Sequence, residues 1–145
     1  MRAESGKKEK CMIHTTFDSE TKPLIVPESF YGKHEKQCDV CVITFSHKVI
    51  EWALANLKCE QIAEIGCCNG NRPIYITEWK GRKVAFYMTL VSSSAAATCI
   101  EEAHCMAGCE HYIMFGSCGT LDSAKTDGKL IVPDSAYRDE GLSYH

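Results

Sequence analysis

The sequence predicts an α/β fold in which a mixed β-sheet is flanked by helices. Short apolar runs of strand length alternate along the chain with segments whose apolar residues repeat at helical spacing. Two neighbouring strand-like segments are joined by a tight turn, which adds antiparallel pairing to the sheet. We expect residues 38–145 to form this α/β domain and residues 1–37 to be an N-terminal arm or irregular segment.

The segment 1–37 holds clusters of Lys and Glu, two prolines (Pro23 and Pro27) and one apolar patch, Leu24–Val26. An arm that lies over the domain or over a neighbouring subunit fits this composition, and so does a frayed end. The first ten residues are charged and have no apolar core of the kind found in a secretory signal peptide.

The domain begins with Val40–Phe45, a continuous apolar run typical of a strand buried on both faces. Ser46 is a good N-cap for a helix that extends to about Lys58. Its apolar stripe at helical spacing consists of Val49, Ile50, Ala53, Leu54 and Leu57.

An antiparallel meander follows. Ile62–Ile65 starts a strand, and the strand-like segments 73–79 and 83–88 are connected by a turn at Lys80-Gly81. Ser92–Ser94 then caps a helix that continues to about Ala107.

Gly108 directly follows this helix, at the position where a glycine in the left-handed conformation commonly ends a helix. His111–Phe115 is predicted to be the next buried strand, and Asp127–Pro133 a further short strand.

The composition is that of an ordinary globular domain, with 145 residues, 45% hydrophobic and 24% charged. A net charge of −3 gives no general attraction to nucleic acid or to an anionic membrane, so we expect neither as a partner. No apolar run approaches the ~20 residues that span a bilayer. We expect a cytoplasmic protein, in which the ten cysteines are mostly reduced, buried thiols.

A CxxC motif, Cys38–Cys41, could be half of a zinc site. Cys105 and Cys109, with neighbouring histidines, could supply the other half. However, spacing of i and i+3 on a strand points the two thiols of the motif to opposite faces, so we expect no metal. A cysteine-rich redox or zinc-binding protein stays open as an alternative.

The glycine-bracketed loop Gly116-Ser-Cys-Gly119 directly follows a predicted buried strand. Ligands of open α/β sheets gather at the carboxyl ends of strands, and backbone N–H groups together with the Ser117 hydroxyl suit an anion. His47 lies in the first turn of the first helix, where a cation is mildly unfavourable unless an anion binds nearby. A tight turn without a ligand is the alternative for the loop, and solvated side chains are the alternative for His47. No catalytic residue can be assigned from the sequence.

Four segments, in this order and spacing, resemble the nucleoside phosphorylase family, which includes the purine nucleoside and uridine phosphorylases. They are Trp79–Val84, Ile113–Gly119, Asp127–Pro133 and Arg138–Gly141. The resemblance covers residues 38–145 and implies an α/β fold of that family. It also implies that this chain corresponds to the first half of the fold, because the family's ribose and base contacts lie mainly in a second half.

The resemblance implies a phosphate site formed by Gly116, Ser117 and Gly119. Lys48 would stand in for the arginine of the family's loop after the first strand, and Arg72 for an arginine lent by a neighbouring subunit. The family's arginine just before the loop is replaced by Met114. Residues expected to contact the nucleoside are Thr89, Arg138 and Glu140.

The activity implied is phosphate-dependent cleavage of the N-glycosidic bond of a purine or pyrimidine nucleoside, as in nucleoside salvage. Inorganic phosphate would be the co-substrate, with no other cofactor, and the protein is expected to be a homo-oligomer. A catalytically silent relative, acting as an oligomer subunit or small-ligand binder, is the alternative. We expect that this chain by itself does not turn over nucleosides.

Overall fold

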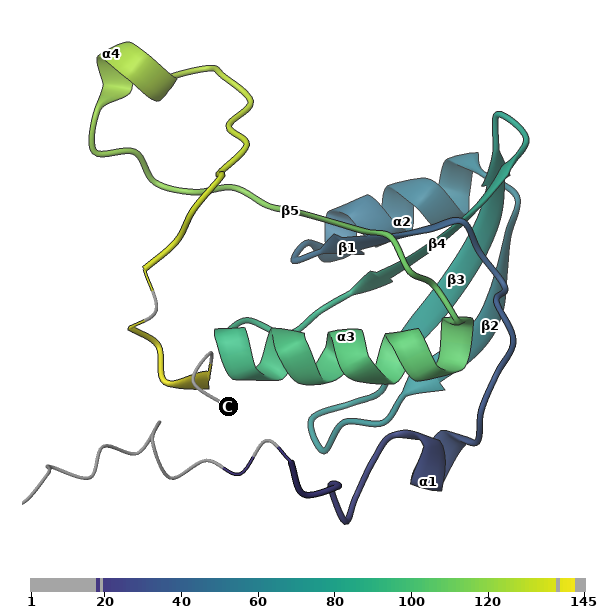
Figure 1. Cartoon of the computed structure of the whole chain (residues 1–145). Coiled ribbons are helices and arrows are strands. Elements are labelled where there is room, and N and C mark those ends of the chain that lie inside the picture. Colours follow the sequence, from purple (N-terminus) through teal and green to yellow (C-terminus); the bar gives the residue numbers. More distant parts are fainter. Residues whose placement is uncertain (1–17, 19, 138, 143–145) are drawn as a thin grey trace, which may run out of the picture.

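A computed structural model describes residues 18, 20–137 and 139–142 (Figure 1). In these residues a five-stranded sheet has the strand order β2-β3-β4-β1-β5. Its strands are β1 (Val40–Thr44), β2 (Cys59–Ile65), β3 (Arg72–Trp79), β4 (Arg82–Met88) and β5 (Tyr112–Phe115). The helices are α1 (Glu28–Tyr31), α2 (His47–Asn56), α3 (Ser93–Ala107) and α4 (Ser123–Thr126).

The sheet is mixed, which confirms the prediction of an α/β fold with a mixed sheet. The central strand β1 pairs in parallel with β4 on one side and with β5 on the other. The strands β2, β3 and β4 form the antiparallel meander that the sequence indicates. The second strand begins three residues earlier than Ile62, at Cys59, and β2 is irregular between Gln61 and Ala63.

Helix α3 covers one face of the sheet, and the core lies between them (Figure 1). Side chains at alternate positions of the strands point to this face, as the pleat requires. Small helix residues let α3 approach the sheet closely, and both of its cysteines, Cys99 and Cys105, are buried as small hydrophobic side chains. The largest buried side chains of this core are Tyr87, Ile43, Ile65 and Ile74.

Helix α2 packs on the opposite face and contacts β4. The rings of Tyr75 and Phe86 stack on this face with centroids 5.5 Å apart. Of the predicted apolar stripe only Ala53 is buried, and Leu54 is exposed. The helix ends at Asn56, two residues before the predicted end, because Leu57 is already extended.

Helix α3 has the predicted boundaries. The Ser92 hydroxyl accepts a hydrogen bond from the Ala95 N–H at 3.2 Å, and Gly108 ends the helix with φ +61°. A side chain at Gly108 would also collide with the backbone of residues 35–36, which passes directly beside it.

Two predictions for the segment after α3 are wrong. Strand β5 is at the edge of the sheet, so that three of its four residues are exposed instead of buried. Residues 127–133 form no strand; they belong to an exposed segment that extends away from the sheet (Figure 1). An apolar run predicts pairing, but pairing also needs a neighbouring strand with free backbone groups.

The CxxC motif also differs from the prediction. Both Cys38 and Cys41 belong to the same buried core, because Cys38 precedes β1 and strand alternation does not apply to it. Burial and a neighbouring thiol, that of Cys109, raise the pKa of Cys38 to about 12, which keeps it a neutral thiol.

Candidate functional site

The loops that follow the three parallel strands meet at one edge of the sheet. The Thr89 N–H, just after β4, donates to the carbonyl oxygen of Thr44 at the end of β1, at 2.9 Å. A Cβ atom added to Gly116, just after β5, would lie 3.1 Å from the ring of Phe45. This is the carboxyl edge, where ligands of open α/β sheets bind.

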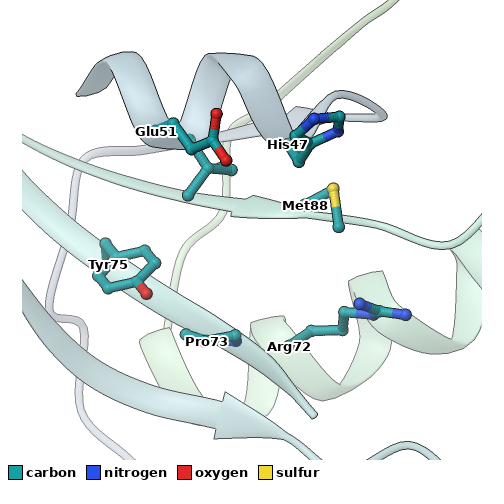
Figure 2. A pocket seen from close by; sticks show the side chains of 7 residues that line it. His47, Glu51, Arg72, Pro73, Tyr75 and Met88 are labelled. Carbon is teal, nitrogen blue, oxygen red and sulfur yellow. The ribbon is translucent and has the colours of Figure 1, made fainter. Parts of the chain in front are cut away.

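The antiparallel strand β3 begins at the same edge, since it pairs with the end of β4. Its first residue, Arg72, lines a cavity of about 140 Å³ between β3, β4 and α2. Figure 2 shows His47 and Glu51 on α2, Met88 on β4, and Tyr75, Pro73 and Arg72 along β3. Ile50 completes the lining.

Two buried polar atoms at this edge have no hydrogen-bond partner in the described part of the chain: Nε of Arg72 and Oγ1 of Thr89. Thr89 is only 4% exposed. Leaving a buried donor unpaired costs about 1–3 kcal/mol, so such groups are rare outside functional or strained places. A guanidinium and a hydroxyl both donate hydrogen bonds to phosphate oxygens.

The polar lining of the cavity is mixed: Arg72 is positively charged, Glu51 is acidic, and His47 adds an imidazole. Lys48, expected to be the cation of this loop, is exposed on α2 and does not line the cavity. The basic side chain that α2 presents to the cavity is the imidazole of His47, one position earlier. A helix turn rotates neighbouring residues by about 100°, so one position decides which side chain faces the sheet.

The loop 116–119 lies beside Phe45 but is open to solvent, and the Ser117 side chain is exposed. Neither Gly116 nor Gly119 adopts a positive φ, and a Cβ atom at Gly119 would meet nothing within 4 Å. The glycine at 116 therefore serves close packing against Phe45 and does not form a left-handed turn.

Glu140, expected to contact the nucleoside, does not line the cavity. Arg138 is outside the described residues. Glu140 is exposed in the segment after α4 and accepts a hydrogen bond from the Leu142 N–H at 3.0 Å. Met114, in the place of the family's arginine, is exposed on β5.

Sequence reasoning missed Glu51, Tyr75 and Met88 as lining residues. Glu51 is four residues after His47, which puts both on one helix face, and this spacing could have identified it. Tyr75 and Met88 could not be assigned, because each follows from the register between β3 and β4.

No group of three or more His, Cys, Asp or Glu side chains able to hold a metal ion occurs in the described residues. Nor does the part of the chain described here contain a helix long and apolar enough to cross a membrane.

A search of curated proteins gave no match to the chain. The family model of the phosphorylase superfamily matches residues 39–145, which include the whole sheet, the cavity and the loop after β5. The chain therefore belongs to the phosphorylase superfamily.

Proposed function

We propose that the protein binds inorganic phosphate at the carboxyl edge of its sheet and uses it to cleave the N-glycosidic bond of a purine or pyrimidine nucleoside. One observation carries the proposal: Arg72 and Thr89 present buried, unpartnered donors at the edge where the loops after β1, β4 and β5 meet. Membership of the phosphorylase superfamily supports the same reaction class.

In this reaction a phosphate oxygen forms a bond to C1′ of the nucleoside while the bond from C1′ to the base nitrogen breaks. The products are a sugar 1-phosphate and the free base, which takes up a proton as it leaves. Positive charge develops on the sugar in the transition state, and a phosphate held close to C1′ stabilises it. The contribution of Arg72 is to fix and orient that phosphate, which lowers the entropy cost of the reaction.

Phosphate titration of ¹⁵N-labelled protein, followed by NMR, tests the binding step. Phosphate should shift the amide signals near Arg72, Thr89 and residues 116–119. Arg72→Gln should weaken binding at least tenfold, since one charge-assisted contact is worth about 1.5–3 kcal/mol. Arg82→Gln is the matched control, because Arg82 is exposed at the opposite end of β4 and should leave binding unchanged.

Release of free base from uridine and from inosine, with and without phosphate, tests the chemical step. Phosphate-dependent release that Arg72→Gln abolishes would support the proposal and would contradict the expectation from the sequence that this chain by itself does not turn over nucleosides. Equal phosphate binding in Arg72→Gln and Arg82→Gln would contradict the site.

A catalytically silent phosphate binder is the second candidate, and Met114 favours it. An exposed methionine stands where the resemblance places a phosphate-binding arginine. This candidate predicts phosphate binding without base release. Met114→Arg should then tighten phosphate binding roughly tenfold. Unchanged binding in a folded variant would show that β5 does not face the anion.

A further inference from the structure

A second cavity lies away from the carboxyl edge, between α3 and the segment that contains α1. It has a volume of about 310 Å³ and shares no lining residue with the cavity at Arg72. Helix α1 contacts α3, and Figure 1 shows it below that helix, near β2. This size is at the lower end of the ~300–1,000 Å³ of small-molecule sites.

One wall of this groove is apolar. It is formed by Ile25, Val26, Pro27 and Phe30, of which Ile25 and Phe30 are largely exposed. Exposed apolar side chains gathered at a cavity gain free energy when an apolar group covers them, at roughly 25 cal/mol per Å².

The opposite wall is acidic. Glu101 and Glu102 on α3 line it, together with Thr98 and Tyr31. Among the described residues neither carboxylate forms an ion pair, and the lining contains no Lys, Arg or His. The groove therefore combines two carboxylates with an apolar wall and has no cation of its own.

The groove is held in shape by contacts that fix the arm to α3 and to the loop after β2. The Tyr31 hydroxyl donates to Oε2 of Glu102 at 2.7 Å and accepts from the Gly66 N–H at 3.2 Å. The Cys105 thiol donates to the Gly32 carbonyl at 3.0 Å. Burial and the Glu102 carboxylate raise the pKa of Tyr31, so its hydroxyl stays protonated as the donor.

We propose that this groove binds a small organic cation with an apolar body, such as an aralkylammonium. The ammonium group lies against Glu101 and Glu102, and the apolar body lies on Ile25 and Phe30. Charge complementarity decides the class: a neutral apolar ligand would leave the carboxylates beside a desolvated surface, and an anion would be repelled. This site is independent of the proposed phosphorolysis.

The test compares 2-phenylethylammonium with the neutral 2-phenylethanol, two probes of nearly equal shape, by NMR titration of the whole ¹⁵N-labelled chain. We expect millimolar binding of the ammonium, with shifts at residues 25–31 and 98–102, and about tenfold weaker binding of the alcohol. Added salt should weaken binding of the ammonium but not of the alcohol, because the carboxylates are accessible to screening ions.

Glu101→Gln and Glu102→Gln keep the side-chain shape and, at 102, a hydrogen-bond acceptor for Tyr31. Each variant should weaken binding of the ammonium several-fold and leave binding of the alcohol unchanged. Glu110→Gln is the matched control, because Glu110 is exposed just beyond α3 and does not line the groove.

Equal binding of the two probes, or ammonium binding that neither glutamine variant weakens, would overturn the proposal. So would the absence of shifts at residues 25–31 up to tens of millimolar. If a second copy of the chain covers the groove, Phe30→Ser should lower the mass measured by sedimentation equilibrium, and this result would also overturn it.

Discussion

Replacing Tyr87 by phenylalanine should stabilise the protein. Tyr87 lies in β4 under α3 and is 0% exposed. Its hydroxyl has no hydrogen-bond partner in the described residues. The substitution keeps the ring, and therefore the packing, and removes only a buried polar atom that lost its water on folding.

An unpaired buried hydroxyl costs about 1–3 kcal/mol in mutational data. We therefore expect the free energy of unfolding to rise by about 1 kcal/mol, the lower end, because the new Phe ring leaves a small space. In a domain of this size that gain should raise Tm by about 3–5 °C, and the urea midpoint by roughly 0.5 M.

The alkaline limb of stability gives a second readout. Burial raises the pKa of Tyr87 above its ordinary value of 10.0. Above pH 10 the unfolded chain releases this proton while the folded protein keeps it. The free energy of unfolding therefore keeps its full value below pH 10 and falls as the pH rises further. Phenylalanine has no such proton, so the variant's advantage should grow between pH 9 and pH 11.

The assay is urea unfolding followed by circular dichroism at several pH values. Tyr112→Phe is the matched control. The Tyr112 hydroxyl donates to the Cys109 carbonyl at 2.7 Å, so its loss should destabilise by about 1 kcal/mol. Opposite signs for the two variants are the expected result. A Tyr87→Phe protein destabilised as much as Tyr112→Phe would refute the reasoning, since both hydroxyls would then be satisfied.

Two further predictions concern the ends of α3. Gly108→Ala should lower the free energy of unfolding by more than 2 kcal/mol, because the φ of Gly108 is +61° and the new Cβ would lie 2.7 Å from Cα of Lys36. Gly119→Ala is the control: the space around Gly119 is open, so this variant should be neutral in the same urea titration. Ser92→Ala should lower the free energy of unfolding by about 1 kcal/mol, because the cap hydrogen bond of α3 is lost. Ser46→Ala should lower it much less, because the Ser46 side chain makes no cap hydrogen bond. Equal losses in the two variants would contradict this account.

Local patterns were sufficient for most elements. The apolar run at Val40, the Lys80-Gly81 turn and the Ser92 and Gly108 boundaries of α3 each depend on neighbours a few residues away in the chain. Burial of a whole strand could not be predicted in this way. Strand β5 is as apolar as β1, yet it is exposed because β1 has a neighbour on both sides and β5 on one.

The candidate site, like the fold, could be predicted only in part from the sequence. The sequence by itself determined the superfamily and the mixed sheet, since these depend on motifs and their order. The resemblance to the family also led to the expectation that Arg72 contacts phosphate and Thr89 contacts the nucleoside. Only the tertiary structure decided that His47 instead of Lys48 faces the cavity, that Glu51, Tyr75 and Met88 line it, and that the loop at Ser117 stays open to solvent. The physical reason is that helix rotation and strand register bring together side chains that no spacing in the sequence connects.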